Sequence, residues 1–272
     1  MEPALQRRVQ RYGWDKASGF YESAWHLQLK PAQDAVIEMA AIGKREKVID
    51  IACGTGLVSF RACDTVGPNG YVLGTDISDK MVEIASQTAR EMHIENIQFE
   101  RMDGEELIVE DGFFDVAICA LGLMYMPDPI KALKEMKRVV RQRGRVAVAV
   151  WGQRANCGWA DIFEIIDRKV SSEVCPLFFN LGNSNMLQRS MEAAGLGKVQ
   201  LKRINTILQY NSDEEACKAA FEGGPVALAY HKFSDDIKNI VKEEYLSSIR
   251  IFKNGNGYSM PGEFVVAVGF HE

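Results

Sequence analysis

The stretch Lys47-Val-Ile-Asp-Ile-Ala-Cys-Gly-Thr-Gly56 joins a short apolar run to two closely spaced glycines. The run is rich in β-branched residues, which is typical of a central strand in a parallel sheet covered by helices on both faces. Gly54 and Gly56 have no side chains, so the backbone can turn sharply there and a ligand can approach the main chain. The stretch therefore predicts a buried strand that leads through a nucleotide-sized turn into a helix.

A second predicted strand, Tyr71-Val-Leu-Gly-Thr-Asp76, ends in a carboxylate 20 residues after Gly56. At this spacing an acidic residue meets the diol of a bound ribose. A nicotinamide-binding unit gives a similar pattern, but its fingerprint needs a third glycine, and Ser59 stands at that position. An NAD(P)-dependent oxidoreductase is the alternative that this pattern leaves open.

Asp50 is a carboxylate within the first predicted strand. Burying it is unfavourable unless it finds hydrogen-bond partners or a cationic ligand. Two interpretations follow: Asp50 takes part in binding the cofactor, or it is a purely structural carboxylate that holds the glycine loop.

Four motifs, in order and spacing, carry a family resemblance: Val48-Ile-Asp-Ile-Ala-Cys-Gly-Thr-Gly56, Gly74-Thr-Asp-Ile-Ser78, Asp103-Gly-Glu-Glu-Leu107 and Phe114-Asp-Val-Ala-Ile-Cys119. They resemble the motifs of class I S-adenosylmethionine-dependent methyltransferases, closest to the branch that includes the ubiquinone and menaquinone biosynthesis C-methyltransferases. The resemblance covers about residues 30 to 152. It implies S-adenosylmethionine as the cofactor and S-adenosylhomocysteine as its product.

The resemblance also implies which residues bind the cofactor. In the family the residue matching Asp103 binds the adenine amino group, and a carboxylate is a suitable acceptor for that donor. Because three of the four residues from Asp103 to Glu106 are acidic, a solvated acidic loop is the alternative. The expected cofactor-binding residues are Tyr21, Asp50, Ala52, Gly54, Gly56, Asp76, Ile77, Met81, Asp103, Gly104 and Cys119.

The alternation of strand and helix patterns over residues 30–151 gives five βα units and predicts a doubly wound, mostly parallel sheet of the α/β class. Pro31 is expected to open the helix that feeds the first strand. Two later strands, 199–210 and 262–270, match the family's seven-stranded Rossmann-like sheet, in which an antiparallel last strand lies between the fifth and sixth. Helical inserts at about 152–184 and 212–255 are expected to form a lid over the acceptor, and the apolar residues 175–179 either line its chamber or dock the lid.

Residues 1–29 form a predicted helical leader ahead of a domain spanning 30–272. Aromatic and apolar residues recur over 4–27 among polar neighbours, as on one or two amphipathic helices. The resemblance implies that the segment from Trp14 to Tyr21 folds over the cofactor, whose sulfonium an aromatic face attracts by about 0.5 to 2 kcal/mol. The alternative is that the aromatics only pack the leader onto the core, which we favour for Trp25.

Composition narrows the class of protein further. With 272 residues, 47% of them hydrophobic, the chain can bury the core of one α/β domain with additions. It holds no apolar run of about 18 residues for a membrane span, and its N-terminus lacks a secretion signal. The six cysteines form no Cys-x-x-Cys pair and no metal-like group with the four histidines, which favours a reducing, cytoplasmic location and no metal. A net charge of -5 with scattered cations argues against a nucleic-acid surface.

These observations predict methyl transfer by in-line displacement to a small, partly apolar acceptor, with O- or C-methylation slightly favoured. Positioning and exclusion of water can supply most of the rate, so a dedicated base is not obligatory. If a base is needed, His26 and His231 are the catalytic candidates, because His93 and His271 are expected away from the pocket. The oligomeric state is left open.

A S-adenosylmethionine-binding module without catalysis is a further alternative, since fold does not fix function. An enclosed apolar cavity beside the methyl group would favour an enzyme. A pocket plugged by Leu123, Met124 and Phe178 would favour the binding module.

Overall fold

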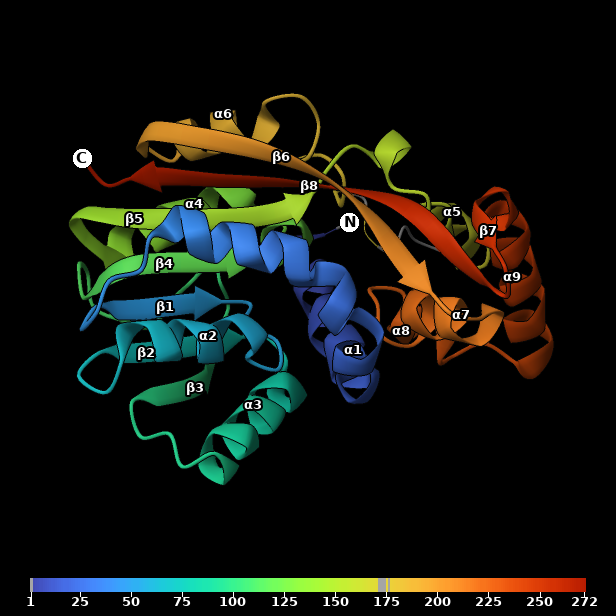
Figure 1. The fold of residues 1–272 in the computed structure, drawn as a ribbon, viewed down its shortest axis with the longest axis horizontal. Coiled ribbons are helices and arrows are strands. Elements are labelled where there is room, and N and C mark those ends of the chain that lie inside the picture. Colours follow the sequence, from blue (N-terminus) through green and yellow to red (C-terminus); the bar gives the residue numbers. More distant parts are fainter. Residues whose placement is uncertain (1, 171–174, 176) are drawn as a thin grey trace.

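A computed structural model describes residues 2–170, 175 and 177–272. Its centre is one mixed sheet with the strand order β3-β2-β1-β4-β5-β8-β6 (Figure 1). The strands are β1 (Lys47–Ile51), β2 (Tyr71–Asp76), β3 (Ile97–Arg101), β4 (Phe114–Ala120), β5 (Val140–Trp151), β6 (Gly197–Tyr210) and β8 (Gly257–Phe270); the two-residue β7 (Lys253–Asn254) pairs with β8. The first five strands pair in parallel, and β8 is antiparallel to both β5 and β6. The predicted sheet, with its antiparallel last strand between the fifth and sixth, is confirmed.

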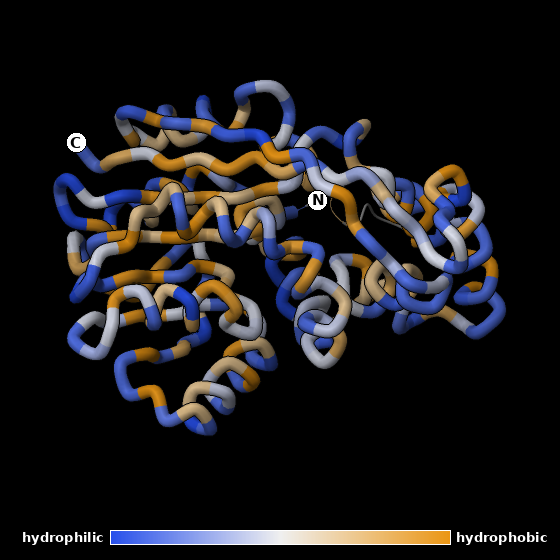
Figure 2. The backbone as a smooth tube through the Cα atoms, in the orientation of Figure 1, coloured by the Kyte–Doolittle hydropathy of each residue, from blue (hydrophilic) through white to orange (hydrophobic). Residues whose placement is uncertain are grey.

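The strands are apolar because helices cover both faces of the sheet, as the hydrophobic colouring along the central strands in Figure 2 shows. Val48, Ile49 and Ile51 of β1 are completely or almost completely buried. Helix α2 (Leu57–Val66) and the second half of α1 lie on the near face in Figure 1, while α4 (Pro129–Val139) and α6 (Met186–Ala193) lie on the other. Helix α3 (Asp79–Glu91) packs on β2 and β3, and the side chain of Ser78 caps its N-terminus as expected.

Helix α1 (Pro3–Ala40) corrects the prediction that a new helix opens at Pro31, because Pro31 lies inside it. Proline cannot donate to the carbonyl of Leu27 one turn earlier. Leu27 is 73% exposed, so water can reach this side of the helix. Figure 1 shows the two halves of α1 running in different directions, as a proline kink produces. The expected boundary between residues 29 and 30 therefore falls within one helix.

Strands β6 and β8 are 14 residues each, against 5 in β1. They stay paired from Gly197 and Phe270 to Tyr210 and Tyr258, and extend past the carboxyl ends of the parallel strands (Figure 1). The helices beside this extension are α5 (Ile162–Asp167), α7 (Asp213–Phe221), α8 (Ala227–Tyr230) and α9 (Asp235–Ser248). They fall within the predicted inserts, of which residues 171–174 and 176 lie outside the described part of the chain.

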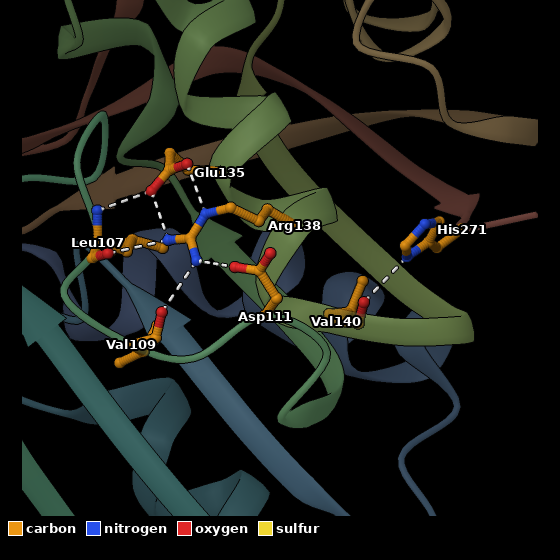
Figure 3. A network of polar contacts seen from close by, with 7 residues as sticks. All are labelled: Leu107, Val109, Asp111, Glu135, Arg138, Val140 and His271. Carbon is orange, nitrogen blue, oxygen red and sulfur yellow. Dashed lines mark hydrogen bonds and ion pairs between the residues drawn. The ribbon is translucent and has the colours of Figure 1, made fainter.

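The loop between β3 and β4 is fixed by Arg138 of α4 (Figure 3). Its guanidinium donates hydrogen bonds to the carbonyls of Leu107 and Val109, both at 2.9 Å. Glu135, which pairs with Arg138 at 2.7 Å, accepts a hydrogen bond from the Leu107 amide at 2.9 Å. This anchoring positions a loop that begins at Asp103, one of the expected site residues.

Within the described ranges, no helix combines the length and apolar character needed to cross a membrane.

Candidate functional site

A cleft of about 700 Å³, measured to its open mouth, lies where the loops after β1, β2, β3 and β4 meet. This is the carboxyl edge of the parallel strands, where open α/β sheets bind their ligands. The first half of α1 covers it with Arg7, Gln10, Trp14 and Tyr21. Of the residues predicted to bind the cofactor, the structure brings these to the cleft: Tyr21, Ala52, Gly54, Asp76, Ile77, Met81, Asp103 and Gly104.

Asp76, at the end of β2, is the buried acceptor of the cleft, with 7% of its surface exposed. Its Oδ2 accepts a hydrogen bond from the Gly54 amide at 2.9 Å, and its Oδ1 accepts one from the Ser78 amide at 2.8 Å. Burial raises the pKa of Asp76 to about 6, and the amide hydrogen bonds oppose that rise. Each carboxylate oxygen keeps a lone pair with which it can accept a ligand hydroxyl.

The two glycines of the loop have different roles. Gly54 has φ +57°, and a Cβ built there would meet only the Tyr21 ring, at 3.5 Å. Its backbone is thus open to a ligand beneath Tyr21. Gly56 has φ +90°, and a Cβ there would lie 2.8 Å from Phe60 Cε2 and 3.1 Å from Phe99 Cζ. Gly56 starts α2 and packs against these rings instead of lining the cleft.

Asp50 also lies behind the lining, with 1% of its surface exposed. Its Oδ2 accepts a hydrogen bond from Ser59 Oγ at 2.6 Å, while its Oδ1 has no partner among the described residues. Burial raises its pKa to about 7, and the nearby Asp76 carboxylate adds to the rise. The Ser59 contact agrees with the structural interpretation, and an exposed fraction of 1% means that Asp50 could favour a cationic ligand only through its charge, from behind the lining.

Cys119 was expected at the cofactor and is instead buried within β4. A Cβ built at Gly122 would lie 3.1 Å from Cys119 Sγ, so Gly122, which lines the cleft, lies next to the thiol. Burial raises the pKa of the Cys119 thiol to about 12. The neutral thiol therefore belongs to the core of the sheet.

Asp103 forms an ion pair with α1, the helix that covers the cleft. Arg7 Nε lies 2.9 Å from Asp103 Oδ2, and the same guanidinium pairs with Glu105. Glu105 is buried, with 1% exposed, and accepts a hydrogen bond from the Asp128 amide at 3.0 Å. The alternative of a solvated acidic loop therefore does not hold for Glu105, which is part of the loop's internal structure.

Arg7 and Gln10 line the cleft although no sequence motif pointed to them. Arg7, Trp14 and Tyr21 stand seven residues apart, and Gln10 follows Arg7 by three, a spacing that places all four on one side of a helix. That periodicity was the available signal.

A second cavity adjoins the cleft and shares Trp14, Tyr21, Leu121 and Tyr125 with it. It is called the acceptor chamber after the role that is proposed for it below. It measures about 320 Å³ to its mouth. All four tryptophans of the chain line it: Trp14, Trp25, Trp151 and Trp159. The ring centroids of Trp151 lie 4.8 Å from those of Trp159 and 6.1 Å from those of Trp25.

The chamber's wall comes from segments far apart in the chain. Trp151 ends β5, Gly224 and Pro225 come from the loop between α7 and α8, and Leu29 comes from α1. Within the apolar stretch 175–179, Pro176 lies outside the described residues, while Phe178 packs 5.6 Å from Trp159 between ring centroids. Phe178 thus packs against Trp159 without lining the chamber itself. Trp25, which we expected only to pack the leader, also lines this chamber.

Neither predicted catalytic histidine reaches the cleft or the chamber. His26 is exposed on α1, and His231 is exposed just after α8. The titratable groups that line the chamber are Tyr21 and Tyr125. Burial raises the pKa of both phenols well above the ordinary value, so both stay protonated at neutral pH. His271, whose Nδ1 lies 2.9 Å from the Val140 carbonyl (Figure 3), belongs to the end of the sheet as expected.

The cleft's residues suit a nucleoside that carries positive charge. Asp76 can accept from a ribose diol, and the charge of Asp50 behind the lining favours a cationic group. Ile77, Met81 and Met102 add an apolar wall next to Asp76 and Asp103, as a flat base requires.

Residues 42–176 match the family model described as a methyltransferase domain. This region is a class I S-adenosylmethionine-dependent methyltransferase domain. Its cofactor is S-adenosylmethionine, as the four motifs predicted.

The methyltransferase domain is similar to two demethylmenaquinone methyltransferases. The relative from Lactococcus lactis is 34% identical over 146 residues, covering 53% of this chain and 58% of the relative. The relative from Listeria welshimeri is 29% identical over 134 residues, covering 49% of this chain and 57% of the relative. The chain thus spans a little over half the length of these relatives.

Among solved structures, the fold is similar to phosphoethanolamine N-methyltransferase 2 of Haemonchus contortus in complex with S-adenosyl-L-methionine. The TM-score is 0.62 at 13% identity, over 95% of this chain and 57% of that one. At this identity the likeness concerns the fold alone.

Proposed function

We propose that this protein transfers a methyl group from S-adenosylmethionine to a small, largely apolar ring compound held in the acceptor chamber. The observation that carries the proposal is that this chamber, walled by every tryptophan of the chain, adjoins the cofactor cleft at Trp14, Tyr21, Leu121 and Tyr125. The similarity to demethylmenaquinone methyltransferases favours a quinone-related ring and methylation at carbon or oxygen.

When bound, S-adenosylmethionine supplies an electrophilic methyl group for in-line displacement. Asp76 would accept from the ribose hydroxyls, Asp103 would accept from the adenine amine, and Asp50 would favour the positive charge from behind the lining. The tryptophan walls hold a flat acceptor and exclude water, which places the two reactants in attack geometry. Tyr21 and Tyr125, the titratable groups among the described residues that line the chamber, stay protonated, so an acceptor that is already an enolate, a phenolate or an electron-rich ring fits this site best.

The alternatives fit this site less well. Of the three side chains that would plug the pocket of a non-catalytic binding module, only Met124 lines the chamber, which argues against that alternative. Ser59, which stands where a dinucleotide site needs its third glycine, is completely buried and hydrogen-bonded to Asp50. A dinucleotide site has a glycine there for close packing of the helix on the strand, so this residue argues against a nicotinamide enzyme.

The test is calorimetric titration with S-adenosylmethionine and, separately, with NADH, for the wild type and Asp76→Ala. We expect a dissociation constant of about micromolar size for S-adenosylmethionine, weakened at least about tenfold in the variant, and no NADH binding. Asp64→Ala, an exposed carboxylate on α2, is the matched control. Turnover is then followed as S-adenosylhomocysteine formed with quinols and phenols. Binding of NADH but not of S-adenosylmethionine would overturn the proposal.

A further inference from the structure

We infer that the indole N–H of Trp159 is the polar recognition group of the acceptor chamber and donates a hydrogen bond to an oxygen on the acceptor's ring. The inference rests on the proposed function, because it specifies the acceptor of that same site. The ligand class is a flat ring compound that carries a carbonyl or a phenolate oxygen.

The first observation is a buried hydrogen-bond donor without an acceptor. Trp159 has 2% of its surface exposed, and its Nε1 is buried without a hydrogen-bond partner in the described part of the chain. Buried polar groups of native proteins are nearly always paired. Because Trp159 lines the chamber, its unpaired N–H is suited to a partner that arrives with the ligand.

The second observation is the surroundings of that donor. The rings of Trp151, Phe163 and Phe178 lie 4.8, 5.8 and 5.6 Å from the Trp159 ring, measured between centroids. Aromatic faces accept hydrogen bonds only weakly. The neighbours of Trp159 thus offer its N–H no strong acceptor, and a ligand oxygen would meet little competition.

The third observation is position. Trp159 lines the chamber but not the cleft, whereas Tyr21, Leu121 and Tyr125 line both. An oxygen bound at Trp159 would leave the rest of the ring between Trp159 and the opening to the cleft. The indole would then orient the acceptor, by deciding which ring position faces the methyl donor.

The chemistry also gives selectivity. An indole N–H donates and cannot accept. It would therefore favour carbonyl and phenolate oxygens over hydrocarbons of the same shape. The aromatic walls of the chamber suit a flat ring.

The experiment compares two probes of nearly equal shape, 1-tetralone, which has a carbonyl, and tetralin, which has none. Their affinities are measured by calorimetry on protein saturated with S-adenosylhomocysteine. Because all four tryptophans line the chamber, quenching of tryptophan fluorescence checks that a probe enters it. The variants are Trp159→Phe, which removes the N–H, and Trp25→Phe, which removes the same ring atoms from another wall of the chamber and keeps the Trp159 donor.

We expect the wild type to bind 1-tetralone about five- to tenfold more tightly than tetralin, as one hydrogen bond provides. Trp159→Phe should lose this preference, while Trp25→Phe should weaken both probes and keep it. Equal binding of the two probes by the wild type, no binding of either, or a preference that survives in Trp159→Phe would overturn the inference. The comparison of the two probes on the wild type tests the inference even if a variant fails to fold.

The two proposals can fail separately. Absence of S-adenosylhomocysteine binding, or of methyl transfer to any quinol or phenol, would count against the proposed function. The probe preference is measured without turnover, and it can be measured without the nucleoside as well.

Discussion

Asp15 of α1 binds the start of α3: its Oδ1 accepts hydrogen bonds from Ser78 Oγ at 2.6 Å and from the Lys80 amide at 3.1 Å. Ser78 Oγ at the same time accepts from the Met81 amide at 3.1 Å. One serine therefore caps α3 and holds the helix that covers the cleft, two residues after Asp76. Helix α1 is thus linked through Ser78 to the end of β2, which carries Asp76.

Replacing Asp15 should loosen that connection. In Asp15→Ala we expect S-adenosylhomocysteine to dissociate about three- to tenfold faster, because two hydrogen bonds that keep α1 over the cleft are lost. Stopped-flow measurement of release gives the rate. Lys16→Ala, an exposed neighbour, should release the nucleoside at the wild-type rate. Equal rates in Asp15→Ala and the wild type would show that α1 does not control release.

The buried carboxylates predict how stability depends on pH. Asp50 and Asp76 have pKa values raised from 3.8 to about 7 and about 6. Between about pH 4 and about pH 7 the folded, ligand-free protein therefore holds protons that the unfolded chain has lost. Their contribution to the free energy of unfolding is then greatest below about pH 4 and declines as the pH rises to about 7. Chemical denaturation across this pH range should show that the free energy of unfolding declines less in Asp50→Asn than in the wild type.

The affinity for the cofactor should depend on the same two carboxylates, but it should rise with pH where the stability of the ligand-free protein falls. A cation bound beside Asp50 and Asp76 favours their ionised forms, so binding near pH 6 should release protons and affinity should rise up to about pH 7. Calorimetry in two buffers with different ionisation enthalpies measures the release. We expect Asp50→Asn to release fewer protons, and an unchanged count would place the cation elsewhere.

Arg138 should matter for stability more than its exposure suggests. Arg138→Ala leaves the carbonyls of Leu107 and Val109 without their donor and Glu135 without its cation, so we expect a loss of about 2 kcal/mol in the free energy of unfolding. Chemical denaturation gives the value. Arg141→Ala, whose side chain is 52% exposed beside Asp115, should lose less than about 1 kcal/mol. Similar losses in both variants would contradict the anchoring role of Arg138.

The histidines give a prediction of no effect. His26→Ala and His231→Ala should retain methyl transfer within about twofold of the wild type, because both side chains are exposed and neither lines the cleft or the chamber. A loss of about a hundredfold in either variant, at unchanged stability, would restore that histidine as a base.

The parts of the fold that sequence reasoning found are those with local signals. The β-branched run of β1, the glycines of its loop and the Ser78 cap each act within a few residues, and they stand where expected. The continuity of α1 through Pro31 could not be found in this way. Its two halves pack on different elements, the first beside α3 and α8 and the second over β5 and β8, and this tertiary packing overrides the local proline signal.

The acceptor chamber illustrates the same limit within the site. Its four tryptophans come from α1, from the end of β5 and from the segment that follows it, and no motif joins them. The position of Trp151 at the carboxyl end of a central strand was the one available indication. The burial of Glu105 could not be predicted from the sequence either, because it depends on an ion pair with Arg7, nearly a hundred residues away.

The packing of α1 over β8 bears on how the chain folds. Helix α1 lies near one end of the sequence and β8 near the other, yet they are in contact. A contact between such distant segments closes a very long loop, which slows folding. Until β8 inserts between β5 and β6, the apolar side of α1 lacks part of its covering. A chain under synthesis would therefore expose part of the aromatic side of α1 until β8 has emerged, and during that interval it would be prone to aggregation.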